Sequence, residues 1–395
     1  MFLIQPNIKR WLTLVLACLT FICGILYVCR NLLWERGFDI VDELGGNIFP
    51  SAILSTAATN AEIMVPADSN YVGKPLSGIA ICLRSTHSNS RVRVILNESP
   101  YFSESISEFI LEKPATDYYI YPEIIWNYEA LKNNIQSTPL TFSVRVELNG
   151  KKLPVKTETL SVRSVNECLL GYKDSKNRFH DTGIFFAAYV NEENPMIDKL
   201  LREALNARIV KRFWGYQGTE EQVDKQVYAL WYVLQKRNFK YSSISNSSLS
   251  SNVVFAQRVR TFDNALESSQ INCVDGSVLF ASLLKAININ PILVRIPGHM
   301  FVGYYTDKTH RNMKFLETTF IGEVDLNDFF PEEELDSAFV GKSQKEMSLL
   351  TFEKSKQYAT EKYQKHEKKL RSGDFNYMFL EISKKTRSRI QPIGK

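Results

Sequence analysis

The longest apolar run of the chain lies close to its start. Residues 11–29 carry no charged side chain, and basic residues stand on both sides of them. An uncharged run of this length is about what a helix needs to cross the hydrocarbon core of a membrane. The pattern predicts a cytoplasmic tail and transmembrane helix over residues 1–30. We therefore expect a single-pass protein of the cell membrane, anchored by residues 11–29, with extracytoplasmic soluble domains.

The next part of the chain changes from an irregular pattern to one typical of strands. Residues 31–75 show no clear period and are interpreted as a linker. The clearest alternation of apolar and polar positions runs over residues 140–148, and residues 155–162 alternate again. Asn-Gly at 149–150 stands shortly before the second run, which is a strong signal for a β-hairpin. Several short strands of this kind predict an Ig-like β-sandwich over residues 76–170.

Helical periods dominate from about residue 185. A helix is expected from Pro195 to Ala207, with the proline in its first turn, and a longer one from Glu220 to Arg237, where apolar residues recur at helical spacing. A charged helix is expected near residues 345–370. With the short strands described next, residues 185–395 are predicted to form an α+β domain.

The stretch from Asn272 to Thr319 carries the candidate chemistry. Asn272 suits the N-cap of an amphipathic helix, and Asp275 adds a negative charge to the first turn of that helix. Three short, mostly apolar runs follow the helix. They predict strands at residues 292–296, 300–305 and 314–319.

Three side chains of this stretch form a candidate catalytic triad. Cys273 falls in the first turn of the predicted helix, where the backbone N–H groups and the helix dipole favour a thiolate and can stabilise an oxyanion. His299 begins the second strand and is the candidate base. Glu317 lies on the third run and would orient the imidazole.

The combined pattern resembles the transglutaminase-like core of the papain-related cysteine hydrolases. The resemblance covers residues 185–395 and implies a papain-like α+β domain in which Cys273, His299 and Glu317 are catalytic. It departs from the common pattern at Glu317, where many members have Asp, and at Phe301, where Trp is commoner. The motifs that carry it are Asn272-Cys273-Val274-Asp275, Leu279 to Leu283, Ile289 with Pro291, His299-Met300-Phe301, and Glu317-Thr318-Thr319.

Further short matches narrow the resemblance to a bacterial, membrane-anchored group of this superfamily. They are Asn191-Glu192, Gly215-Tyr216-Gln217 and Pro297-Gly298-His299. In this superfamily a second oxyanion donor lies on the segment before the nucleophile helix. The resemblance therefore makes Gln217 a candidate for that donor.

Composition limits the other classes of function. The chain has 48 Lys and Arg against 43 Asp and Glu, and the basic residues are scattered, so no nucleic-acid partner is expected. No histidines and cysteines stand at metal-ligand spacing, so we infer no metal and no cofactor.

The expected function is a membrane-anchored thiol acyl-transfer enzyme that acts on a peptide or protein substrate. Its outcome is either hydrolysis or transamidation, and the sequence does not choose between them. The alternative is a non-catalytic module that uses the same fold to bind a peptide or protein.

Overall fold

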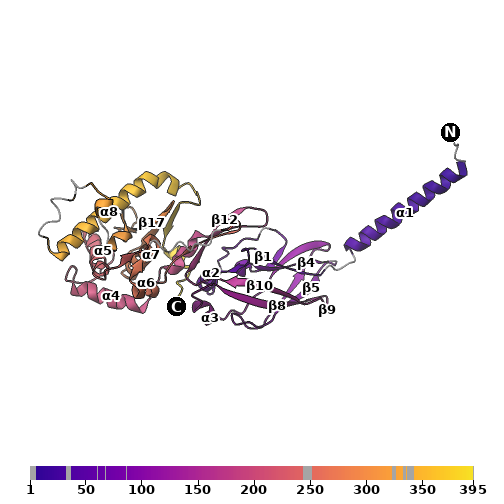
Figure 1. Ribbon diagram of the computed structural model, residues 1–395, viewed down its shortest axis with the longest axis horizontal. Coiled ribbons are helices and arrows are strands. Elements are labelled where there is room, and N and C mark those ends of the chain that lie inside the picture. Colours follow the sequence, from indigo (N-terminus) through magenta and orange to yellow (C-terminus); the bar gives the residue numbers. More distant parts are fainter. Residues whose placement is uncertain are drawn as a thin grey trace. The chain divides into compact units, whose positions relative to one another are not determined.

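The structure is a computed structural model that describes residues 6–32, 37–59, 61–66, 68–85, 87–242, 251–322, 326–331, 335 and 342–394 (Figure 1). The chain divides into two compact units, each assembled from separate stretches. Unit 1 contains residues 1–46, 65–127 and 139–161, and unit 2 contains residues 47–64, 128–138 and 162–395.

The prediction of a transmembrane helix is wrong. The first helix, α1, runs from Pro6 to Leu32. A spanning helix must be both long and apolar along its length. Across the described residues, no helix satisfies the two requirements together. The single-pass localisation and the membrane contact through residues 11–29, which were inferred from that helix, are therefore without support.

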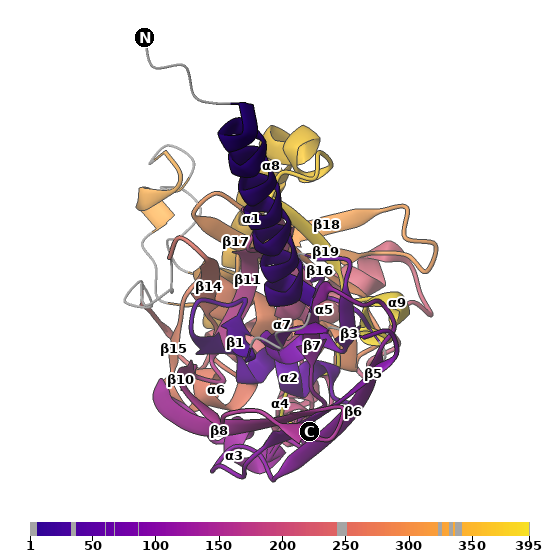
Figure 2. The same cartoon turned by 90° about the vertical axis from the view of Figure 1, so that its right-hand side faces the viewer.

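The strands of unit 1 belong to two sheets. One sheet has the order β1, β4, β7, β3, in which β3 and β7 run parallel. The other runs β10, β8, β5, β6 (Figure 2), and the short β9 pairs with β8. The bounds are β1 Asp39–Asp42, β3 Tyr71–Gly73, the 3-10 helix η1 Pro75–Ser77, β4 Ile79–Ser85, β5 Ser90–Leu96, β6 Ser105–Leu111, β7 Thr116–Tyr121, β8 Thr138–Leu148, β9 Lys151–Lys152 and β10 Lys156–Val162.

The predicted alternation and its hairpin are confirmed in β8. Every second residue from Leu140 to Leu148 is buried, as a strand with one apolar face requires. Leu148 pairs with Lys151, so Asn149 and Gly150 form a two-residue turn, and both have positive φ, 51° and 81°. That geometry is the reason for the Asn-Gly pair, since few other residues adopt it at low cost.

Unit 2 mixes short strands with helices. Its sheets have the orders β12, β11, β14, then β13, β15, and finally β18, β17, β16, β19. The bounds are β2 Asn47–Ile48, α2 Pro50–Thr56, α3 Tyr128–Lys132, β11 Glu167–Lys173, β12 Phe179–Asp181, η2 Gly183–Tyr189, α4 Pro195–Asn206, α5 Glu220–Gln235, β13 Lys240–Tyr241, β14 Val254–Arg258, α6 Phe262–Ser268, β15 Gln270–Ile271, α7 Cys273–Ala286, β16 Pro291–Ile296, β17 His299–Tyr305, β18 Met313–Leu316, η3 Thr318–Ile321, η4 Leu326–Asp328, α8 Gln344–Leu370, β19 Met378–Glu381 and α9 Lys384–Arg387.

The sheet formed by β16 to β19 carries a hydrophobic cluster of unit 2. Apolar side chains on one face of β16, β17 and β18 pack against α8. The helix α7 contacts β16 and β17. The cluster comprises Ile292, Val294, Ile296, Phe301, Tyr305 and Phe315 from the sheet with Ala359, Tyr363 and Leu370 from α8.

The predicted fold class needs correction. The chain is a mixed α/β protein, and none of its described helices is long and apolar enough to serve as the expected membrane anchor. The stretch expected to be a β-sandwich, residues 76–170, is interrupted by α3, and residues 128–138 belong to unit 2. The expected linker, residues 31–75, contains strands and the buried helix α2. Tertiary packing makes these short segments part of the two units, which a local pattern does not reveal.

Candidate active site

The site is built around the start of α7, whose N-terminus is capped as the sequence predicts. The side chain of Asn272 accepts a hydrogen bond of 2.8 Å from the N–H of Asp275, and Asp275 accepts one of 3.2 Å from the N–H of Asn272. This capping box satisfies two N–H groups that a helix start leaves without partners. Cys273 is thereby fixed as the first residue of the helix.

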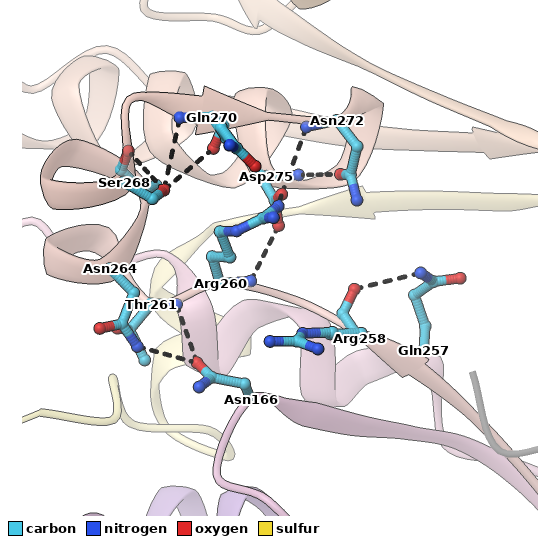
Figure 3. A network of polar contacts seen from close by, with 11 residues as sticks. Asn166, Gln257, Arg258, Arg260, Thr261, Asn264, Ser268, Gln270, Asn272 and Asp275 are labelled. Atoms are coloured by element: carbon cyan, nitrogen blue, oxygen red, sulfur yellow. Dashed lines mark hydrogen bonds and ion pairs between the residues drawn. The ribbon is translucent and has the colours of Figure 1, made fainter. Parts of the chain in front are cut away.

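Asp275 does more than complement the helix dipole. Its side chain is almost fully buried and forms an ion pair with Arg260, whose backbone N–H also donates to it at 2.8 Å (Figure 3). Asn166, the residue before β11, accepts hydrogen bonds from the N–H of Thr261 and from the side chain of Asn264 in α6, which hold the segment that follows Arg260 (Figure 3). The start of α7 is therefore held by charge as well as by capping.

The interior of α7 is buried on nearly every side, rather than on the single inner face that was predicted. The backbone of α7 approaches Thr318 closely at Gly276, because glycine has no Cβ; an added Cβ would lie 2.9 Å from Oγ1 of Thr318. Ser277 lies 3.3 Å from the same hydroxyl and donates a 2.7 Å hydrogen bond to the carbonyl of Cys273. The first turn of α7 therefore packs directly against η3, the segment that follows Glu317.

His299 is brought to the site by a tight hairpin between β16 and β17. Ile296 pairs with His299, so Pro297 and Gly298 form the turn, and Gly298 has a φ of +73°. Proline presets its own φ, and glycine accepts the positive φ that the turn needs. The imidazole, 25% exposed, lies with Nε2 2.5 Å from Oε2 of Glu317.

Glu317 is fully buried, and its carboxylate oxygens and its backbone N–H all have hydrogen-bond partners. It lies just beyond β18 and caps η3, so it is not in the interior of a strand as predicted. Its Oε1 accepts hydrogen bonds from the N–H of Thr319 at 3.1 Å and from the hydroxyl of Thr319 at 2.8 Å. Its own N–H donates at 2.9 Å to the hydroxyl of Ser355 in α8. A buried carboxylate requires such partners, and these leave Oε2 for the imidazole.

The electrostatics of the site favour a charged imidazole. Burial acts to lower the pKa of His299, but hydrogen bonds with Cys273 and Glu317, and the negative charges of both, raise it from 6.5 to about 10. Because Glu317 occupies Nε2, Nδ1 is the ring nitrogen that remains for the thiol. A protonated imidazole beside a cysteine favours the thiolate, which is the nucleophilic form.

Cys273 and His299 share one cavity of about 380 Å³ in unit 2. Tyr241 lines the same cavity, because β13 pairs in parallel with β15 and β15 leads directly into the start of α7. Burial, together with the negative charges of Cys273 and Glu317, raises the pKa of Tyr241, so its hydroxyl stays protonated. The remaining lining residues are Leu170, Phe186, Gln257, Asn272, Val274, Arg295, Ile296, Pro297, Gly298, Met300 and Asn376.

The structure does not bring the predicted oxyanion donor Gln217 to this cavity. Gln217 is exposed, and neighbouring Gly215 lies against Ile287 and Asn288, at the C-terminal end of α7. The helix has 14 residues, and at about 1.5 Å per residue it is about 20 Å long. Its length therefore separates this loop from Cys273.

Other lining residues were missed by the sequence interpretation. Gln257 comes from β14 and Asn376 from the segment before β19, both outside the stretch that carries the triad, and no local signal marks them. Arg295 did leave a signal, since it is the only charged residue in the apolar strand β16. A single cation in a buried strand is costly and points to a role.

The remaining tests of function come from metal-site geometry and from comparison with known proteins. Over the described residues, no group of three or more His, Cys, Asp or Glu side chains is placed to hold a metal ion. Comparison with protein-family models and with curated proteins finds no match to this chain.

Proposed function

We propose that unit 2 is a thiol acyl-transfer enzyme that acts on a peptide or protein through Cys273, His299 and Glu317. The observation that carries the proposal is the bond of 2.5 Å between His299 and the buried Glu317, beside a cysteine that opens a capped helix. An enzyme of this kind needs a nucleophile, a base and a group that orients the base, within reach of a cavity.

In the acylation step, the thiolate of Cys273 attacks the carbonyl carbon of an amide or ester. A bond forms between sulfur and carbon, and the carbonyl electrons move to oxygen. The intermediate then breaks its bond to the leaving amine or alcohol. The imidazolium of His299 gives that group its proton, which leaves a thioester on Cys273.

The second step releases the acyl group to water or to an amine. The neutral imidazole of His299 takes a proton from the incoming nucleophile, which attacks the thioester carbon. The bond to sulfur breaks, and the pair of thiolate and imidazolium is restored. Water gives hydrolysis, and an amine gives transamidation. Glu317 keeps the imidazole oriented and stabilises its charge throughout.

The oxyanion formed in both steps needs donors. The N–H of Cys273 belongs to the first turn of α7, where helix geometry supplies no backbone acceptor. Tyr241, a protonated phenol that lines the cavity, replaces Gln217 as the candidate for the second donor. The residues of the transglutaminase-like motif, in the same order along the chain, add support to this assignment of roles.

The test is the rate at which iodoacetamide alkylates Cys273 in the purified full chain, measured against pH. We expect rapid alkylation at pH 6, far below the range in which an ordinary thiol reacts, because the imidazolium favours the thiolate. A His299→Ala variant should lose that reactivity. A Cys273→Ser variant identifies the modified residue.

A wild-type profile that matches the His299→Ala profile would mean that the thiol and imidazole do not act together. In that case the domain is better described as a module that binds a peptide or protein without catalysis.

A further inference from the structure

Among the described residues that line the cavity beside Cys273, Arg295 is the one cation that the proposed mechanism does not use. Arg295 lies on β16, where it alternates with Val294 and Ile296. Those two neighbours belong to the core that packs against α8. Successive side chains of a strand point to opposite faces, so Arg295 points away from that core and contributes to the cavity lining.

The guanidinium of Arg295 is held by aromatic and carbonyl groups. Its Nη2 donates to the carbonyl of Phe375, and the guanidinium lies 4.9 Å from the centre of the Phe375 ring. Its Nε is buried and has no hydrogen-bond partner. These contacts restrict the position of the guanidinium and leave part of its donor capacity unused.

Among the described residues, Arg295 differs from the other arginines that have a buried Nε, because it forms no ion pair. Arg84, Arg93 and Arg237 also have a buried Nε without a hydrogen-bond partner. Each of those three nevertheless forms an ion pair with a carboxylate, and Arg93 does so through Nε itself. Arg295 forms no ion pair with any carboxylate in the described part of the chain. Asp181 acts on it electrostatically from beyond ion-pair distance.

A largely buried cation without a counter-ion is costly to the fold. Burial lowers the pKa of Arg295, yet a guanidinium stays charged at any physiological pH. The cost is recovered when an anion of matching geometry enters, and a carboxylate matches a guanidinium edge with two hydrogen bonds.

We propose that Arg295 forms a carboxylate-binding subsite beside Cys273, so that the substrate of this site is a peptide with a carboxylate near the bond that is cleaved. This inference rests on the proposed function of the same site. The carboxylate belongs either to the C-terminus of a peptide or to an acidic side chain, and both sources present the same group to Arg295.

The test uses two pairs of alkylating agents that differ only in a carboxylate or an amide. N-bromoacetylglycine and N-bromoacetylglycinamide represent a terminal carboxylate. N-bromoacetyl glutamic acid α-amide and N-bromoacetyl glutamine α-amide represent an acidic side chain. The ratio of alkylation rates within each pair is measured for the full-length wild type, Arg295→Met and Arg258→Met. The last variant is a matched control, since Arg258 is exposed, follows the lining residue Gln257 on strand β14 and does not itself line the cavity.

We expect Arg295→Met to lower the ratio of acid to amide about tenfold for the pair that fits, which is about the contribution of one charge-assisted hydrogen bond. Arg258→Met should keep the wild-type ratio. The pair that responds identifies the source of the carboxylate. Equal ratios in wild type and Arg295→Met for both pairs would overturn the subsite.

A second measurement covers the case in which Arg295→Met does not fold. Wild-type protein is alkylated with iodoacetamide in the presence of N-acetylglycine, N-acetylglycinamide, N-acetyl glutamic acid α-amide or N-acetyl glutamine α-amide. Protection by one of the two acids, without protection by its amide, supports the subsite. Protection by neither acid, or equal protection by acid and amide, overturns it.

The two proposals fail in different ways. An inert or ordinary thiol in the pH profile of iodoacetamide argues against the triad. A free thiol still reacts slowly at high pH, so the ratio of acid to amide remains measurable in that case.

Discussion

Replacement of Gly276 by alanine tests how Glu317 is held beside His299. A Cβ at position 276 would lie 2.9 Å from Oγ1 of Thr318, closer than real Cβ contacts allow, and 3.1 Å from Cβ of Thr318, which is tighter than most. Thr318 is fully buried and follows Glu317 directly in the chain. Relief of the clash must therefore move the segment that carries the carboxylate.

Two opposing effects decide the stability of this variant. Alanine inside a helix is favoured over glycine by about 0.5–1 kcal/mol. Overpacking of a buried contact costs about 1–3 kcal/mol. The short, β-branched Thr318 side chain has no flexible end that can turn away, so the overpacking cost is the larger. We expect a net loss of about 1 kcal/mol in the free energy of unfolding.

Gly276→Ala should affect the reactivity of Cys273 more than it affects the stability of the fold. A misplacement of about 1 Å in a catalytic group can cost on the order of 100-fold in rate. The shift needed here is a fraction of that, so we expect about tenfold slower alkylation of Cys273 by iodoacetamide at pH 6. Urea unfolding measures the stability, and the alkylation rate measures the site.

A double-mutant cycle supplies the control. Thr318→Ala removes the hydroxyl that the new Cβ would meet, so Gly276→Ala combined with Thr318→Ala should regain most of the lost stability and part of the rate. Residues in contact show such coupling, whereas distant ones add. If Gly276→Ala alone is more stable than wild type and reacts at the wild-type rate, contact with η3 does not position Glu317.

Three further outcomes follow from the contacts of the site. Asp275→Asn breaks the buried pair with Arg260 and should cost about 3 kcal/mol in urea unfolding; an unchanged midpoint would show that the pair is not needed to hold the start of α7. Tyr241→Phe should slow thioester formation from an activated ester while iodoacetamide alkylation stays at the wild-type rate, because alkylation forms no oxyanion; equal slowing of both reactions would rule out an oxyanion role. The pKa of His299 is raised from 6.5 to about 10, so the stability that its protonated form contributes is complete below pH 6.5 and is lost as the pH rises towards 10. The difference in unfolding free energy between wild type and His299→Gln should shrink over that range, and a difference independent of pH would contradict the charged pair.

Much of the local structure of the site could be predicted from particular residues. Asn272 and Asp275 stand three apart, which is the spacing of a capping box, so the helix start and the place of Cys273 follow from neighbouring residues. Gly298 after Pro297 marks the turn that leads to His299. These signals are local, because each depends on residues within one turn of the chain.

The sequence-based predictions differ from the structure where tertiary packing, rather than a local pattern, decides the arrangement. Gln217 was matched by a short motif, but its loop lies at the far end of α7. Glu317 was assigned to a strand, yet it ends the strand and caps η3. The apolar run of residues 11–29 suggested a membrane span that the described helices do not support.

By itself, the sequence determined the order of Cys273, His299 and Glu317 and the elements that carry the first two, because capping and turn preferences act between neighbours. Only the tertiary structure decided how these residues meet. It brings Ser355 and Thr319 to the buried Glu317, and it leaves Arg295 beside the cavity without a carboxylate partner among the described residues. Those contacts join segments far apart in the chain, and they depend on which surfaces pack together, for which no single stretch of sequence carries a signal.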